Sequence, residues 1–281
     1  MKKAIKISLW GLLALGLLIS CDPEKEDSSV DSDYTAKSDY TETAFGLNMK
    51  MIYVKGGTFR MGATEEQGAD AYNSEYPVRN IHLTGYHIGK YEVTQAQWKA
   101  VMGTSLREQR DKANPAWGIY GEGDSYPMNY VSWEEAREFC QKLSEATGKR
   151  YILPTEAQWE YAARGGNKSR HYKYAGSNDI DEVAWYKENG DNISHPVGTK
   201  KANELGCYDM SGNVMEWCSD WATLYFENDT INPMGALNGS YRIHRGCSWN
   251  NDARLLRVSH RAWDTATGRF YDVGFRVACI Y

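Results

Sequence analysis

Apolar and polar positions along the chain predict a few capped helices and short strands separated by long loops. Residues 51–62 read as a strand, a Gly-Gly turn and a second short strand, and residues 78–91 read as alternating strands. Three segments with helical spacing begin at a good N-cap residue and end at glycine. Their predicted caps are Thr94 and Gly103, Ser132 and Gly148, and Thr155 and Gly165.

Regular patterns become scarce after Gly166 and return only at residues 274–281, a short alternating strand. Few helices, scattered strands and structured loops predict an α+β fold. We find no linker or internal repeat between residues 49 and 281, so we assign this part to one domain.

The first residues have the pattern of a secretory signal. Lys2, Lys3 and Lys6 precede an apolar run over residues 7–19, which ends at Ser20-Cys21. This ending resembles the bacterial lipobox and predicts a signal peptide over residues 1–20 with a lipid-anchored Cys21. The alternative is a plain signal peptide with an incidental cysteine. The lipobox interpretation places the protein in the bacterial cell envelope.

Residues 21–48 are acidic, polar and poor in core formers, which predicts a flexible tether. The acidic cluster after Cys21 resembles the surface-export signal of some Gram-negative lipoproteins, so we expect an outer-membrane lipoprotein exposed at the surface. Its members are Asp22, Glu24, Glu26 and Asp27.

Composition limits the function classes. The formal charge is −5 and no basic tract stands out, which argues against a nucleic-acid partner. With 10 Trp, 20 Tyr and 26 Gly, the chain has the composition of a loop-rich protein in which amphipathic aromatics anchor irregular segments. This pattern suits binding modules as well as enzymes.

The six cysteines include Cys21, which leaves an odd number in the domain. At least one thiol is therefore free or paired between molecules. We predict a disulfide between Cys140 and Cys279, and consider Cys247 the thiol most open to chemistry.

Several blocks, in the same order, resemble the formylglycine-generating enzyme (sulfatase-modifying factor) family, and the resemblance covers nearly all of residues 51–281. The resemblance implies a C-type-lectin-like α+β fold that often holds calcium. The blocks are Gly56-Gly57-Thr58-Phe59-Arg60-Met61-Gly62, Tyr91-Glu92-Val93-Thr94, Val131-Ser132-Trp133, Leu153-Pro154-Thr155-Glu156, Ala162-Ala163-Arg164-Gly165-Gly166, Tyr208-Asp209-Met210-Ser211-Gly212-Asn213-Val214, Arg245-Gly246 and Gly274-Phe275-Arg276.

Residues 209–216 predict a structural calcium site. Side-chain oxygens of Asp209 and Glu216, with the carbonyls of Gly212 and Val214, form the hard-oxygen set that calcium prefers. The family resemblance places a calcium at these four positions, and a second one near residues 185–191.

The family's copper-dependent oxidation of a sulfatase cysteine uses two cysteines, which fall at Asn251 and Leu256 when counted from Ser248. Neither side chain can replace a thiolate as a copper(I) ligand, so we expect no copper. Cys247 stands where the family has glycine, and Met215 stands where it has tryptophan. Ser248 is kept.

Other chemistries find little support. Ser248 with His244 or His260 lacks the oriented carboxylate and elbow motif of a nucleophile and base. The remaining histidines do not have the spacing of metal ligands. Glu134 and Glu135 are interpreted as charges in the first turn of a helix and not as an acid/base pair. These histidines are His82, His87, His171 and His195.

Residues 245–276 also resemble the variable region of binders on this fold, which a retroelement diversifies by mutating template adenines. The frame retains Arg245, Gly246, Ser248, Trp249, Asn250, Asn251, Arg254, Arg257, Arg261, Arg269 and Gly274-Phe275-Arg276. Between them stand residues that pyrimidine-ending codons specify: Cys247, Asp252, Leu255, His260, Ala262, Asp264, Gly268, Phe270, Tyr271 and Asp272. The alternative is a fixed, non-catalytic homologue with a structural or adhesive role.

We therefore expect a protein that binds a protein or glycan ligand. The alternative is a sulfatase-maturing oxidase that uses Cys247. Aromatic and arginine side chains dominate binding hot spots, and this loop contains both. Its arginines include Arg257, Arg261 and Arg269, and some of these are expected to form buried ion pairs instead. We expect Trp263, Phe270, Tyr271 and Asp272 to be exposed. The predicted ligand-binding residues are Ser248, Trp249, Asn251, Asp252, His260, Trp263, Asp264, Phe270, Tyr271 and Asp272.

Overall fold

Strands far apart in the sequence meet in three sheets. The computed structural model describes residues 37–225 and 230–281, and the contiguous unit begins at Lys37. The five-stranded sheet has the order β1-β2-β5-β11-β6, and all its neighbouring strands are antiparallel. Its strands are Tyr40–Glu42 (β1), Met49–Val54 (β2), Tyr86–Gly89 (β5), Ala278–Ile280 (β11) and Arg150–Ile152 (β6).

A four-stranded sheet, ordered β10-β7-β8-β9, and a two-stranded ribbon complete the β-structure. The strand β10 runs parallel to β7, whereas β7, β8 and β9 are antiparallel. These strands are Val273–Gly274 (β10), Met215–Trp221 (β7), Arg242–Arg245 (β8) and Arg261–Asp264 (β9), and the ribbon pairs Gly57–Met61 (β3) with Arg79–Leu83 (β4).

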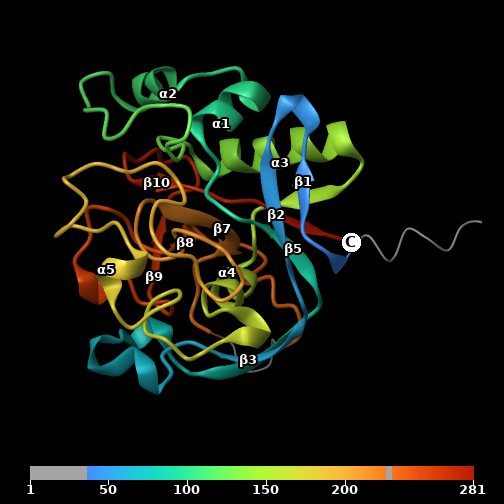
Figure 1. Ribbon diagram of the computed structural model, residues 1–281, viewed down its shortest axis with the longest axis vertical. Helices are drawn as coiled ribbons and strands as arrows, with labels where there is room; N and C mark the ends of the chain where they lie inside the picture. Colours follow the sequence, from blue (N-terminus) through green and yellow to red (C-terminus); the bar gives the residue numbers. More distant parts are fainter. Residues whose placement is uncertain (1–36, 226–229) are drawn as a thin grey trace, which may run out of the picture. The chain divides into compact units, whose positions relative to one another are not determined.

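The helices are Gln95–Met102 (α1), Leu106–Ala113 (α2), Trp133–Thr147 (α3), Glu156–Ala163 (α4) and Ile180–Val183 (α5). In Figure 1, α1, α2 and α3 lie together at the upper side of the molecule, whereas α4 lies at its centre beside β7 and β8. Each predicted N-cap residue forms a capping box. The hydroxyls of Thr94, Ser132 and Thr155 each accept a hydrogen bond from the backbone amide three residues later in the chain. One face of α3 buries Ala136, Phe139, Cys140 and Leu143 in the same apolar core as Met49 and Met51 of the sheet. The α+β prediction is confirmed, as are the three predicted helices α1, α3 and α4, whereas α2 and α5 were not predicted.

One boundary and one sheet differ from the sequence prediction. Residues 37–48, assigned to the tether, belong to the folded unit, because Glu42 accepts hydrogen bonds from Lys149 Nζ and the Tyr151 hydroxyl, each at 2.7 Å. The sheet β7-β8-β9 was missed, because charged residues and a histidine at its buried positions interrupt the apolar alternation: acidic residues in β7, and arginines and His244 in β8 and β9. The predicted signal peptide, Cys21 and the first part of the tether lie outside the described residues.

The predicted disulfide between Cys140 and Cys279 is wrong. Both are free thiols buried in the same apolar core, and the other three cysteines of the described chain are also free and buried. Burial raises the pKa of all five thiols. None of the helices in the described part of the chain is long and apolar enough to cross a bilayer.

Candidate functional site

The loop that follows β8 begins with a tight left-handed turn. Gly246 has φ 89°, and a Cβ there would lie 3.1 Å from the Trp159 ring, so the position requires glycine. Cys247 follows with φ 57°, a conformation that costs a non-glycine residue energy. The amides of Gly212 and Trp249 donate to the carbonyls of Gly246 and Asn213, which join this turn to residues 212–213.

Ser248 anchors the next turn. Its hydroxyl oxygen lies 3.0 Å from both Asn251 Oδ1 and Asp272 Oδ2, and its amide donates to Asn251 Oδ1 at 2.8 Å. Leu256 is 0% exposed and packs in a small apolar cluster with Cys247. The two positions at which the family has copper thiolates are therefore occupied by an amide that caps a turn and a core leucine.

Cys247 and His260 form a buried pair, with Sγ 3.2 Å from His260 Nδ1 and 3.2 Å from the Leu255 carbonyl. Burial raises the pKa of the Cys247 thiol to about 12 and lowers the pKa of His260 to about 3. Both groups are neutral at physiological pH. The thiol is 3% exposed and lacks the thiolate character of a nucleophile or copper ligand.

Ser248 contacts neither histidine of the loop. His244 Nε2 lies 3.1 Å from Asp264 Oδ2, and His260 is engaged by Cys247. The structure therefore does not bring together a serine nucleophile and a histidine base, although those residues are close in sequence.

Three aromatic rings pack together beside Ser248. The ring centroids of Tyr120, Trp249 and Tyr271 lie 5.2–5.8 Å apart, and exposed Asn250 donates to the Tyr271 hydroxyl at 3.0 Å. The Trp249 indole N–H is buried without a hydrogen-bond acceptor among the described residues. Tyr120 was missed by sequence analysis, since it lies in an irregular segment without a recognisable motif.

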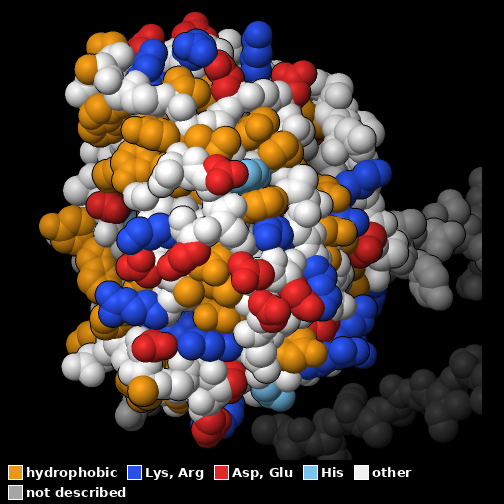
Figure 2. Space-filling model, turned by 60° about the vertical axis from the view of Figure 1, so that its left-hand side comes forward, with side chains coloured by type: hydrophobic (Ala, Val, Ile, Leu, Met, Phe, Trp, Pro, Cys, Tyr) orange, Lys and Arg blue, Asp and Glu red, His pale blue; other side chains and the backbone are white. Residues whose placement is uncertain are grey.

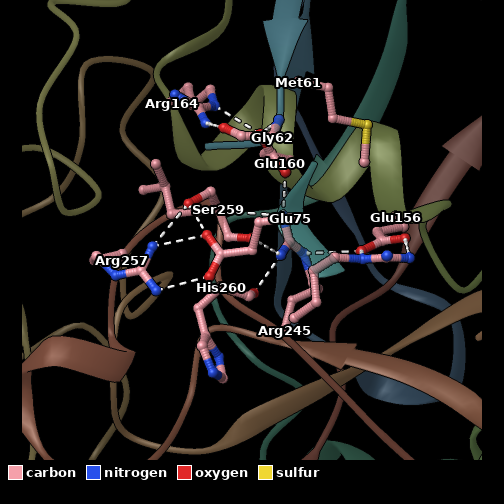
Figure 3. A network of polar contacts seen from close by, with 12 residues as sticks. Met61, Gly62, Glu75, Glu156, Glu160, Arg164, Arg245, Arg257, Ser259 and His260 are labelled. Atoms are coloured by element: carbon pink, nitrogen blue, oxygen red, sulfur yellow. Dashed lines mark hydrogen bonds and ion pairs between the residues drawn. The ribbon is translucent and has the colours of Figure 1, made fainter. Parts of the chain in front are cut away.

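The arginines of the loop hold its backbone to the scaffold (Figure 3). Arg257 pairs with Glu75, Arg261 with Glu156 and Arg245 with Glu160, and all six side chains are buried. Arg245 also donates to the carbonyls of Val258, Ser259 and His260. These arginines are structural, as the buried ion-pair alternative predicted, whereas Arg269 makes a partly exposed pair with Glu135.

The predicted surface is only partly exposed. Trp263 is 44% exposed, as expected, and Phe270 and Tyr271 are half-buried. Asp272 was expected to be exposed, but it is only 7% exposed because its carboxylate accepts from the Ser248 hydroxyl. Asp252 and Asp264 are partly exposed, and Asp252 pairs with Lys187 at 2.8 Å.

The predicted calcium ligands lie in a buried acidic region. Glu216 is neutralised by Arg276 and also accepts from the Trp159 indole at 2.7 Å. Asp209 Oδ2 accepts from the Gly198 amide, whereas Asp209 Oδ1 is buried without a partner in the described chain. Glu92, which sequence analysis overlooked, is also buried and has no ion-pair partner in residues 37–225 and 230–281.

Burial raises the pKa of Glu92 and raises that of Asp209 to about 6. A bound cation or bound protons would therefore neutralise the buried carboxylates of Glu92 and Asp209. A calcium ion at the unpartnered Asp209 Oδ1 is compatible with this need. Within the described residues, no three His, Cys, Asp or Glu side chains are arranged to hold a metal, so such a site would depend on the carbonyls of Gly212 and Val214.

The fold and this loop correspond to a known family. Residues 37–280 match the sulfatase-modifying factor enzyme 1-like domain, and the chain belongs to this family. It is 34% identical over 277 residues to the chaperone protein LppX of Paenibacillus barcinonensis, covering 81% of this chain and 88% of LppX. It is 29% identical over 288 residues to the formylglycine-generating enzyme of Streptomyces coelicolor, covering 81% and 88%.

Among solved structures, the chain is similar to Treponema denticola variable protein 1. The TM-score is 0.74 at 29% identity, with 86% of this chain and 98% of the other covered. The fold is thus that of formylglycine-generating-enzyme-like proteins, as the sequence blocks predicted.

Proposed function

We propose that this protein is a non-catalytic, lipid-anchored member of the family that binds a ligand on the loop surface formed by residues 248–272. One observation carries the proposal: at the two copper positions, Asn251 caps the Ser248 turn and Leu256 is buried in the core. A copper(I) centre needs soft thiolates, and the nearby Cys247 is a neutral buried thiol.

The same loop carries aromatic side chains that can contact a ligand. Trp263 is exposed, Tyr271 is half-buried, and the Trp249 indole N–H has no acceptor within the described residues. Aromatic side chains of this kind supply large contact areas at little cost in conformational entropy. Because the buried arginines fix the loop backbone, its outward-facing side chains can differ without unfolding the domain.

The relatives favour a protein over a glycan as ligand, since LppX is called a chaperone protein. The likeness to variable protein 1 supports a loop whose outward residues are diversified, whereas a fixed adhesive homologue remains the alternative. Charged side chains of both signs are interspersed on the face shown in Figure 2, which supports a partner other than nucleic acid.

A displayed peptide library and a glycan array, applied to the purified full chain, test the binding function. We expect enriched peptides whose binding falls at least tenfold in Trp263→Ala and Tyr271→Ala. Lys55→Ala, an exposed residue outside the 248–272 segment, is the control and should bind normally. Peptides that bind all four proteins equally would show that the loop is not the binding surface.

The enzyme alternative is tested separately with a Cys-x-Pro-x-Arg peptide, copper(I) and oxygen. We expect no formylglycine, because no pair of thiolates is available. Formylglycine formed by the wild type and lost in Cys247→Ala would establish an oxidase and refute the non-catalytic proposal.

A further inference from the structure

A groove of about 440 Å³ lies outside the loop site, between α3, β6 and the facing ends of β7 and β8. Its apolar wall includes Trp133, Tyr151, Ile152 and Leu153, and Arg137, Arg150 and Arg242 also line it. No aspartate or glutamate lines this groove. Its size falls within the range of small-molecule sites.

Arg242 is held as a flat cation between two indoles. Its guanidinium carbon lies 3.6 Å from the Trp133 ring centroid and 3.4 Å from that of Trp221. Because both faces of the guanidinium are covered, its N–H groups can donate only within its plane. One bond goes to the Ser219 carbonyl at 2.6 Å, and Nε is buried without an acceptor in the described chain.

Arg242 is partly buried, and its surroundings differ from those of the domain's buried arginines. Arg164, Arg245, Arg257, Arg261 and Arg276 each contact a carboxylate. Arg242 makes no ion pair with any residue in the described ranges. Burial and the charge of Arg137 lower its pKa to about 10, although the more distant carboxylates of Asp220 and Glu134 act in the opposite direction. A partly desolvated cation without a carboxylate partner favours contact with an external anion.

The charged residues near the groove distinguish Arg242 from its two neighbouring arginines. Arg137 stands between the groove and an acidic surface formed by Glu134, Glu135 and Glu138, so part of its field is cancelled. Arg150 is exposed on β6 and makes no ion pair among the described side chains. Arg242 therefore provides the main anion contact, and Arg150 adds positive charge at the rim.

We propose that this groove binds a small amphipathic anion, a carboxylate or phosphate attached to an apolar body, with Arg242 as the anion anchor. The head group would meet the guanidinium edge, and the apolar body would lie on the wall formed by Trp133, Ile152 and Leu153. The wall supplies hydrophobic burial, while Arg242 supplies selectivity for negative charge.

Isothermal titration of the full chain with one ten-carbon series tests both parts. Decanoate should bind saturably, and decanol and decylamine should each bind at least tenfold more weakly. Decyl phosphate distinguishes the head groups: tighter binding than decanoate assigns the site to phosphates, and weaker binding assigns it to carboxylates. Decanol binding as tightly as decanoate would overturn the proposal.

Arg242→Gln should weaken decanoate binding at least tenfold, and Arg107→Gln, an exposed arginine paired with Glu122, is the matched control that should not. Because Arg242 also packs between two indoles, its replacement can disturb the fold. Arg150→Glu reverses a charge on an exposed side chain, and it should weaken decanoate binding while keeping the thermal midpoint. Unchanged affinity in Arg150→Glu and in folded Arg242→Gln would refute the anion site.

Discussion

Arg257 donates two hydrogen bonds of 2.7 Å to the carboxylate of Glu75, which lies 182 residues earlier in the chain. Both side chains are fully buried, and Ser259 and Gln67 extend the same network. The contact ties the centre of the C-terminal loop to the 3₁₀ turn over residues 73–75. It explains how a loop with little regular structure keeps a defined course.

Arg257→Met should therefore lower the free energy of unfolding by about 3–5 kcal/mol, because it leaves the Glu75 carboxylate buried without a counter-charge. Urea denaturation measures the loss. Arg254→Met, three residues away on an exposed side chain, is the control and should change stability by less than about 0.5 kcal/mol. The double variant Glu75→Gln with Arg257→Met should recover part of the loss, and equal effects of the two single arginine variants would contradict the structural role.

His260 should make stability depend on pH. Burial and the charges of Arg257 and Arg245 lower its pKa from 6.5 to about 3, so the unfolded chain binds a proton that the folded chain refuses between these values. Stability from this residue is complete above pH 6.5 and falls as the pH drops toward 3, by at most about 1.4 kcal/mol per pH unit.

His260→Asn cannot take up this proton, so its stability relative to the wild type should improve as the pH falls through the same window. Urea midpoints measured at several pH values between 3 and 7 provide the comparison. Parallel curves for the two proteins would mean that folding does not lower the pKa of His260.

Calcium should stabilise the domain if Asp209 Oδ1 is a ligand. Chelation should then lower the thermal midpoint, since a ligand at a hundred times its Kd adds about 2.7 kcal/mol to stability. Asp209→Asn should abolish the response, and the exposed Asp124→Asn should retain it. A wild-type midpoint that ignores the chelator would remove calcium from this site and leave protons to neutralise Glu92 and Asp209.

Cys21 should carry the lipid anchor. In a bacterial expression host, Cys21→Ser should move the protein from the membrane fraction to the soluble fraction and prevent labelling by a radioactive fatty acid. Cys207→Ser is the matched control, because this cysteine is buried in the domain and should keep both properties. Membrane association that persists without Cys21 would argue for another means of attachment.

Helix ends that depend only on neighbouring residues were predicted from the sequence. The capping boxes at Thr94, Ser132 and Thr155 and the ends at Gly103 and Gly148 required only neighbouring residues, and the structure has them all. The polar helix α2 and the sheet β7-β8-β9 were missed because few of their residues follow a simple apolar period.

The loop site shows the same limit. Counting from Ser248 identified Asn251 and Leu256, because that inference needed only sequence order. The burial of Asp272 and the packing of Tyr120 against Trp249 depend on contacts between distant segments, which no local pattern encodes. The buried partners of Arg257 and Arg261 lie more than a hundred residues away in the chain.

The strand β11 lies between β5 and β6 in the five-stranded sheet, with Ala278 opposite both Ile88 and Ile152. Residues 278–280 are therefore an interior part of a sheet whose other strands have all been synthesised earlier. A nascent chain cannot close this sheet until the ribosome has passed Ile280. Closure of the five-stranded sheet must therefore wait for β11, and an emerging chain keeps its β5 and β6 edges open to chaperones for that interval.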